Sequence, residues 1–380
     1  MRIGILTLPP NANYGGILQA YALQTVLEEQ GHQVVVFDRQ ISQKNITLYK
    51  RPWIYSKRFI KKYILRKNGL EVFQEKKDFN KECIIRANTQ IFINNHIHRY
   101  TVNKLNDIKK EDFDAIVVGS DQIWRMLYFK SYWNTNKASD AFLGFSKGWN
   151  ILRVAYAASF GISETDVANN EIEECKYAIR HFDAISVREE EGVSICHKIF
   201  GVNAIRVLDP TMLLTKEKYS SLFPKKFKSS PNKPFLAKYI LDETPQIETF
   251  INRIAEIKSL EVKDTNLAGW GNLHHVPTSQ IPVEDWLQFF SVADLIINDS
   301  FHATVFSILF HRQFFVIVNK ERGASRIISL LGMLGLEDRI ITTLDKLPKE
   351  HYIDYKKVDS ILSTERQHSM SFLMNNLRNE

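Results

Sequence analysis

The chain has 380 residues, long enough for two domains, and its 44% hydrophobic and 24% charged residues are typical of a globular protein. Its formal net charge of +7 favours an anionic partner, such as a charged substrate or an anionic membrane surface, and no nucleic-acid-binding motif accompanies that charge. Three widely spaced cysteines indicate neither a disulfide framework nor a cysteine-rich zinc site, and no apolar run is long enough to span a bilayer. We therefore expect a cytoplasmic protein that is soluble, or peripheral at the inner face of the membrane.

Strand-like runs alternate with helical segments through the first half of the chain. The runs are residues 3–7, 33–37, 115–119, 154–157, 184–187 and 205–208. Such alternation is typical of a largely parallel, doubly wound sheet. We predict an N-terminal α/β domain over residues 1–222.

A basic insertion interrupts this domain at about residues 50–67. It carries eight Lys and Arg residues and no acidic one, interleaved with aromatic residues. Basic groups beside aromatic rings suit an anionic lipid surface, so peripheral membrane contact is one interpretation. The alternative is a solvated helix whose aromatic face packs on the first domain.

A second α/β pattern follows a polar, proline-punctuated segment at residues 225–234, which is typical of a linker. Strand-like runs at residues 235–241, 295–298 and 314–318 predict a smaller domain over residues 223–350. Residues 351–380 are helical in pattern, and we expect this tail to pack back on the first domain.

The first candidate site residues follow the first strand. Asn13, Tyr14, Gly15 and Gly16 precede a helical run, and the two glycines permit positive φ and a close backbone approach to a ligand. The helix N-terminus favours anions or hydroxyl oxygens. The pattern is neither a Walker loop nor a dinucleotide fingerprint, and a tight structural turn is the alternative.

Polar and aromatic residues also follow the strand-like run that ends near residue 118. Asp121 and Gln122 can bond sugar hydroxyls while Trp124 covers a pyranose face. Asp121 can also accept a proton from an attacking hydroxyl. In the alternative interpretation, Asp121 caps the next helix and Trp124 fills the core.

The most informative segment is residues 293–304, which combine a short strand, a polar turn and a helix start. Asp299 and Ser300 are favourable caps for that helix. His302 would lie in its first turn, beside backbone N–H groups that stabilise an anion, at the carboxyl end of a strand where α/β proteins bind ligands. A helix-start histidine satisfied by a neighbour is the alternative.

Three arginines near predicted strand ends strengthen the case for an anionic ligand. Arg188 follows the run at residues 184–187, and Arg322 and Arg326 flank a turn after the run at residues 314–318. Guanidinium groups bind phosphate or carboxylate bidentately, although a single arginine is more often a surface residue.

Taken together, these segments resemble the polysaccharide pyruvyl transferase family. The matching segments, in chain order, are residues 13–16, 118–124, 158–161, 186–189, 208–211, 293–304 and 322–339. The resemblance implies an α/β fold of two Rossmann-like domains, similar to GT-B glycosyltransferases, with the site in the interdomain cleft. The first domain would then be the acceptor side and the second the donor side.

The resemblance also implies phosphoenolpyruvate as the donor, with no cofactor or metal required, and a cyclic ketal as the product. The acceptor would be a sugar in a surface polysaccharide, such as a capsule or exopolysaccharide, or in its lipid-linked precursor, and we expect galactose bridged at its 4 and 6 hydroxyls. His302 corresponds to the family's donor-binding histidine, and Phe301 adjoins it. Several members have an arginine where this chain has Ser300, so we look to Arg188 or Arg326 for compensation. A nucleotide-sugar glycosyltransferase and a non-catalytic sugar-binding protein are the competing readings.

Overall fold

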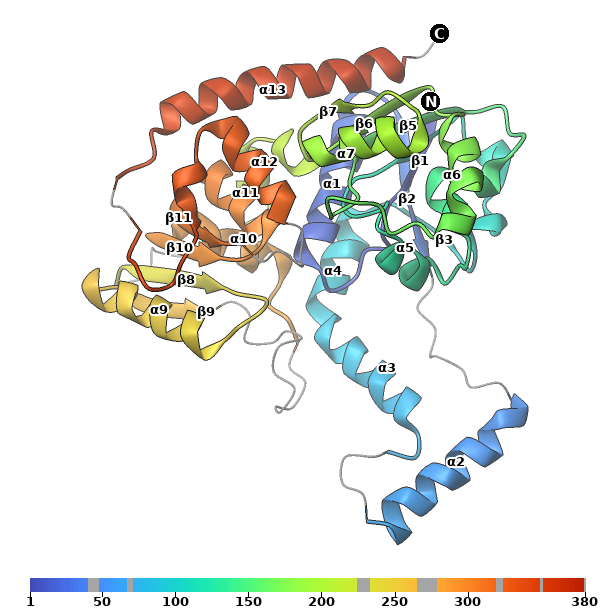
Figure 1. Ribbon diagram of the computed structural model, residues 1–380, viewed down its shortest axis with the longest axis horizontal. Helices are drawn as coiled ribbons and strands as arrows, with labels where there is room; N and C mark the ends of the chain where they lie inside the picture. Colours follow the sequence, from blue (N-terminus) through green and yellow to red (C-terminus); the bar gives the residue numbers. More distant parts are fainter. Residues whose placement is uncertain are drawn as a thin grey trace.

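The computed structural model describes residues 1–39, 48–66, 71–223, 233–264, 279–318, 324–348 and 351–378. These residues form two α/β domains that lie side by side, a long C-terminal helix across both, and a helical arm that extends away from them (Figure 1). The fold is therefore α/β with two Rossmann-like domains in a GT-B-like arrangement, as expected from the sequence. Most of the predicted linker and Arg322 lie outside the described residues.

The first domain is built on a seven-stranded parallel sheet in the order β3-β2-β1-β4-β5-β6-β7. The strands are β1 (Arg2–Leu6), β2 (Gln33–Arg39), β3 (Arg99–Val102), β4 (Ala115–Val118), β5 (Leu152–Ala158), β6 (Ala184–Val187) and β7 (Ile205–Arg206). The order reverses between β1 and β4, and this is where a parallel sheet opens a crevice for ligands.

Helices cover both faces of this sheet. They are α1 (Tyr14–Glu29), α4 (Ala87–His96), α5 (Met126–Trp133), α6 (Ile172–Ile179), α7 (Glu190–Ile195) and α8 (Lys216–Ser220). Helices α1 and α4 share one apolar core with the second domain, whereas α5, α6 and α7 form a separate core on the other face. Because both faces are covered, the central strands are nearly continuous apolar runs, which made them recognisable in the sequence.

The second domain has a five-stranded parallel sheet in the order β12-β11-β10-β8-β9. Its strands are β8 (Phe235–Tyr239), β9 (Glu261–Asp264), β10 (Leu295–Asn298), β11 (Gln313–Ile317) and β12 (Ile340–Ile341), and its helices are α9 (Pro245–Ile257), α10 (Val283–Val292), α11 (Phe301–Leu309) and α12 (Ala324–Leu334). The order reverses between β8 and β10, so the start of α11 lies at the second crevice.

The two domains meet through an apolar contact. Tyr14 at the start of α1 stacks on Trp286 of α10, with ring centroids 5.0 Å apart, and its hydroxyl donates to the carbonyl of Ile281 at 2.9 Å. Residues of both domains belong to the same core cluster. This continuous packing holds the two sheets in one relative position, so that their carboxyl ends face a common space.

Helix α13 (Tyr355–Asn376) runs across both domains (Figure 1). Near its start, Asp359 bonds His311 of the second domain at 2.9 Å. Near its end, the Ser369 hydroxyl accepts from the Leu208 N–H at 2.9 Å, and Arg366 donates to the Met212 carbonyl at 2.6 Å. The helix thus ties the second domain to the loop that follows β7.

The arm consists of residues 48–66 and 71–85, with a short turn η1 (Leu48–Lys50), α2 (Arg51–Phe59), a π-helical turn η2 (Ile60–Ile64) and α3 (Gln74–Ile85). Figure 1 shows α2 and α3 extending away from both domains. None of residues 48–66 is buried, so the alternative in which the aromatic face of the insertion packs on the first domain is wrong. None of the helices within the described ranges combines the length and apolarity that crossing a bilayer requires.

Candidate active site

Four ionisable side chains from both domains meet where the two sheets face each other. Asp121 follows β4, Arg188 follows β6 and Asp209 follows β7, whereas His302 is the second residue of α11. Each lies beyond the carboxyl end of its parallel strand, which is why residues so far apart in the chain converge. Their side chains are all at least nine-tenths buried.

The centre of the site is an ion pair between Arg188 and Asp209. Nη1 of Arg188 donates to Oδ2 of Asp209 at 2.5 Å, and the Ser120 hydroxyl donates to the same oxygen at 3.2 Å. The other oxygen accepts from the backbone N–H and hydroxyl of Thr211 at 3.0 and 2.6 Å. Burial alone would raise the pKa of Asp209, but the charge of Arg188 and the hydrogen bonds from Thr211 lower it, so this carboxylate stays ionised.

His302 lies beside this ion pair in a neutral form. Its Nε2 is 3.8 Å from Oδ2 of Asp209 and has no hydrogen-bond partner among the described residues. Burial lowers the pKa of His302 to about 4, and the charges of Arg188 and Arg326 add to this against the opposing carboxylates. At neutral pH the imidazole is therefore uncharged, and its Nε2 is available to a ligand.

Gly15 sets how closely helix α1 approaches this histidine. A Cβ atom at position 15 would lie 2.0 Å from Nδ1 of His302, so any side chain there would force the imidazole to move. Neither Gly15 nor Gly16 adopts a positive φ, so the conformational reason for these glycines is wrong, whereas the absence of a side chain at Gly15 lets α1 approach His302 closely. The approach is between two helices rather than between backbone and a bound ligand.

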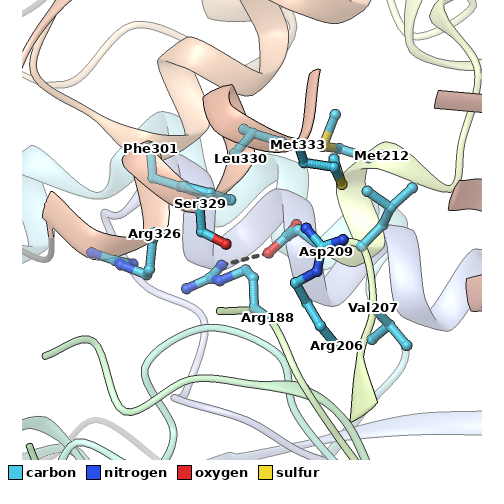
Figure 2. Close-up of a pocket in the computed structure, with 11 residues that line it drawn as sticks. Arg188, Arg206, Val207, Asp209, Met212, Phe301, Arg326, Ser329, Leu330 and Met333 are labelled. Carbon is cyan, nitrogen blue, oxygen red and sulfur yellow. Dashed lines mark hydrogen bonds and ion pairs between the residues drawn. The ribbon is translucent and has the colours of Figure 1, made fainter. Parts of the chain in front are cut away.

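Two buried guanidinium groups flank Phe301. The Arg188 group lies 4.4 Å from the ring centroid and the Arg326 group 5.7 Å from it. Burial, and then the charge of Arg188, lower the pKa of Arg326 to about 10. Figure 2 shows both arginines lining one small pocket with Asp209 and with Ser329 of α12. Although carboxylates balance part of this charge, the guanidinium groups can still donate hydrogen bonds to an anion.

The glutamate after Arg188 connects this pocket to the loop that follows β5. Oε1 of Glu189 accepts from the Ser159 hydroxyl and the Phe160 N–H, both at 2.9 Å. Burial raises the pKa of Glu189, although Arg188 and Arg326 oppose that shift. Glu189 therefore fixes the loop and lies close enough to the two guanidinium groups for their charges to act on its carboxyl group.

The turn before α11 differs in detail from the sequence expectation. Ser300 occupies the N-cap position, but its side chain makes no capping bond, and Asp299 instead accepts from the N–H groups of Leu241 and Asp242 at 2.8 and 3.0 Å. The expected side-chain caps are therefore wrong, because Asp299 joins the loops after β8 and β10. Among the expected donor residues in the described ranges, the structure brings together Ser300, Phe301, His302, Arg188 and Arg326.

The expected acceptor residues are only partly brought together. Asn13 caps α1, its side-chain oxygen accepting from the Gly16 N–H at 3.2 Å, and a Cβ at Gly16 would lie 3.5 Å from Oδ2 of Asp121. Oδ1 of Asp121 is 3.8 Å from Nη2 of Arg188. The backbone of Asp121 has a φ of 53° and therefore lies in the left-handed region. The N-terminus of α1 and Asp121 thus face the arginine pocket.

Two of these residues have structural roles. Trp124 is fully buried, stacks on Phe142 and donates to the carbonyl of Ala141 at 3.1 Å, so it fills the core and has no surface left to cover a sugar. The hydroxyl of Tyr14 is used in the domain contact. We retain neither of them in the site.

Gln122 and Asp121 remain available. Gln122 is partly exposed and lies over Gly161, where a Cβ would approach its amide nitrogen to 1.9 Å. Asp121 does not cap α5, because Asp166 accepts from the first N–H groups of that helix at 2.8 and 3.1 Å. Within the described ranges no cluster of three or more His, Cys, Asp or Glu side chains is placed to hold a metal ion.

The two parallel sheets, with a charged site shared between their carboxyl ends, define a two-domain protein of the GT-B-like class. Within that class, the model of the polysaccharide pyruvyl transferase family matches residues 13–321, and the chain belongs to this family. Family membership makes the protein a transferase of polysaccharide biosynthesis.

Solved structures resemble the chain at low identity. Arabidopsis thaliana UGT89C1 complexed with UDP-L-rhamnose is 10% identical over 98% of this chain and 97% of that one, with a TM-score of 0.49. The UDP-GlcNAc 2-epimerase of Methanocaldococcus jannaschii is 12% identical over 96% and 92%, with a TM-score of 0.44. A mutant O-GlcNAc transferase of Thermobaculum terrenum is 11% identical over 99% of this chain and 64% of that chain, with a TM-score of 0.41. These likenesses concern the fold alone, and no curated protein matches the chain significantly.

Proposed function

We propose that the protein transfers a pyruvyl group from phosphoenolpyruvate to two hydroxyls of one hexose, forming a cyclic ketal and releasing phosphate. The hexose belongs to a surface polysaccharide or to its lipid-linked precursor. Family membership supports pyruvyl transfer in general. The observation that carries the choice of donor is the pair of buried guanidinium groups, Arg188 and Arg326, beside the unpartnered nitrogen of His302.

Phosphoenolpyruvate carries a phosphate and a carboxylate, and the pocket offers two guanidinium groups close to the ring of Phe301. Nε and Nη2 of Arg188 have no hydrogen-bond partner among the described residues, so they are free to donate to an anion. The N-terminus of α11 adds backbone donors from the same side. Arg188 and Arg326 thereby compensate for Ser300, which stands where several family members have arginine.

His302 is the general acid in this scheme. The neutral imidazole gains a proton when the dianionic phosphate binds, because a nearby negative charge raises the pKa of a histidine. It then protonates the methylene carbon of the donor, and the positive charge that develops at the neighbouring carbon is shared with the attached oxygen.

Asp121 is the base that faces the acceptor. One sugar hydroxyl adds to the oxocarbenium carbon and passes its proton to Asp121, after which the bond from that carbon to the phosphate oxygen breaks and phosphate leaves. The second hydroxyl attacks the same carbon, passes its proton to the imidazole of His302, which the first step left neutral, and closes the ketal, while the proton held by Asp121 passes to the released phosphate. Gln122 and the N-terminus of α1 supply hydrogen bonds to the sugar, which we take to be galactose at its 4 and 6 positions. The scheme uses phosphoenolpyruvate as co-substrate and needs no metal or cofactor.

The deciding experiment mixes the purified protein with phosphoenolpyruvate and a panel of galactose- and mannosamine-terminated acceptors, including lipid-linked ones. We expect acceptor-dependent phosphate release and a product whose mass has increased by one pyruvyl ketal. His302→Ala should abolish turnover while the protein stays folded, and the exposed His197→Ala serves as the matched control.

Two outcomes would contradict the proposal. No phosphate release with any acceptor of the panel, together with thermal stabilisation by nucleotide sugars instead of phosphoenolpyruvate, would indicate a glycosyltransferase. Binding of sugar without phosphate release under any condition would indicate a non-catalytic binding protein.

A further inference from the structure

The outer face of the arm exposes a row of large apolar side chains. Tyr49, Trp53, Ile60 and Ile64 are exposed by 77, 66, 46 and 67% of their surfaces. Their separations of four, seven and four residues keep them on one side of a helical segment. Isolated exposed apolar residues are ordinary, but a continuous row on a projecting helix marks a contact surface.

The opposite face of the same segment is already occupied by the start of α3 and the residues just before it. The rings of Tyr55 and Phe73 lie 5.0 Å apart, Arg58 pairs with Glu75 at 2.8 Å, and Lys62 pairs with Glu71 at 2.5 Å. Glu71 and Glu75 are therefore used in ion pairs within the arm and do not contribute to its outer face. The outer face is left with apolar groups and lysines.

Charge identifies the partner of this face. Residues 48–66 contain seven Lys and Arg residues and no acidic one. Lys57 lies 4.7 Å above the ring of Trp53, and Lys50 lies 5.5 Å from that of Tyr49, so cationic heads border the apolar row. Such a combination matches the boundary of an anionic bilayer, where rings enter the headgroup region and ammonium groups meet lipid phosphates. Two copies of the arm face to face would instead bring like charges together.

We propose that residues 48–66 dock in the plane of an anionic lipid surface and hold the protein at the membrane. The attachment of the arm to both domains gives this docking a function. Helix α3 leads into α4, where the Arg86 side chain donates to the Pro10 carbonyl at 3.2 Å, and the Gln280 N–H of the second domain donates to the Ile85 carbonyl at 3.0 Å. Docking would therefore fix the distance between the bilayer and the interdomain site, which suits an acceptor carried on lipid if the proposed function holds.

The test is sedimentation of the full chain with vesicles, which needs no substrate and is therefore independent of the proposed activity. We expect binding to phosphatidylcholine vesicles that contain phosphatidylglycerol, weakening with salt, and none to phosphatidylcholine alone. Replacing Trp53, Ile60 and Ile64 together by Ser should abolish it. Lys57→Gln and Lys61→Gln should each lower the partition constant about fivefold, as one juxtamembrane charge contributes about 1 kcal/mol.

Tyr352→Ser is the matched control, because Tyr352 is 88% exposed in the second half of the chain and its loss should leave vesicle binding unchanged. A second readout is intrinsic fluorescence, which should shift to the blue on anionic vesicles in the wild type and lose that shift in Trp53→Phe. Vesicle binding that survives the triple replacement would overturn the proposal. So would self-association in solution that the triple replacement abolishes, without any vesicle binding, since the face would then join two copies of the chain.

Discussion

Nε2 of His302 lies 3.8 Å from Oδ2 of Asp209, and the two residues belong to different domains. The same carboxylate receives the Arg188 guanidinium at 2.5 Å. Asp209 therefore balances the charge of Arg188 and faces the imidazole at once. Two consequences follow for substitutions at this carboxylate, one for stability and one for the site.

Asp209→Asn should destabilise the fold strongly. The substitution removes the closest charge partner of the Arg188 guanidinium, whose side chain is 2% exposed, and breaking a buried ion pair on one side costs about 3–5 kcal/mol of unfolding free energy. Urea denaturation of the variant measures that loss. The substitution should also lower the pKa of His302 further, because the charge of Asp209 acts to raise that pKa.

The matched control for this prediction is Asp114→Asn. Asp114 pairs with Arg2 at 2.8 Å, but the two side chains are 42 and 48% exposed, so the expected loss is below about 1 kcal/mol. Equal losses for the two variants would mean that the buried pair does not carry the stabilising role assigned to it.

Arg326→Gln should weaken donor binding without unfolding the protein. A hydrogen bond to a charged group contributes about 1.5–3 kcal/mol, so the Kd for phosphoenolpyruvate should rise roughly tenfold to 150-fold. Calorimetric titration with phosphoenolpyruvate measures this directly. The exposed Arg253→Gln on α9 should bind as the wild type does, and an unchanged Kd in Arg326→Gln would remove that arginine from the donor site.

The sequence predicted the central strands well and the peripheral ones poorly. The buried strands are apolar runs, whereas β3 and β9 lie at sheet edges and contain charged residues, so Arg99–Val102 and Glu261–Asp264 show no such run. The two-residue strand β12 is too short to leave any pattern. Tertiary pairing at a sheet edge, rather than local propensity, determines these elements.

The candidate site, too, could be predicted from the sequence only in part. The position of His302 after β10 could be predicted because a strand, a turn and a helix adjoin in the sequence. The role of Asp209 could not, because its ion pair with Arg188 joins residues 21 positions apart in the chain, and the segment alone resembles an ordinary turn. Trp124 was misplaced for a related reason, since an indole after a strand can face either a ligand or the core, and only packing against Phe142 decides.

Gly15→Ala should impair catalysis more than folding. The added methyl group would lie 2.0 Å from Nδ1 of His302, so the imidazole must move, and a displacement of about 1 Å in a catalytic group lowers turnover roughly hundredfold. Phosphate release from phosphoenolpyruvate and acceptor measures the effect. Gly332→Ala is the control, because the nearest atom to its new methyl group would be 3.7 Å away. Wild-type turnover in Gly15→Ala would show that the position of His302 does not matter.

The pH dependence of stability tests the state of His302 itself. Its pKa is about 4 in the folded protein against 6.5 as the ordinary value, so between these two pH values the unfolded chain binds a proton that the folded one does not. Stability is therefore unaffected by this group above pH 6.5 and falls by up to about 3 kcal/mol as the pH decreases to 4. The difference between the wild type and His302→Gln, measured by urea denaturation over this range, isolates the contribution.

A direct measurement separates this effect from other groups that titrate in acid. The imidazole signal of His302 in the folded wild type, followed by NMR, should titrate well below pH 6.5, and bound phosphoenolpyruvate should move its midpoint upward because the phosphate favours the charged ring. A midpoint near 6.5 in the empty protein would show that burial does not depress this pKa. A midpoint that the donor leaves unchanged would remove His302 as the acid, since the ring would then be uncharged when the methylene carbon has to be protonated.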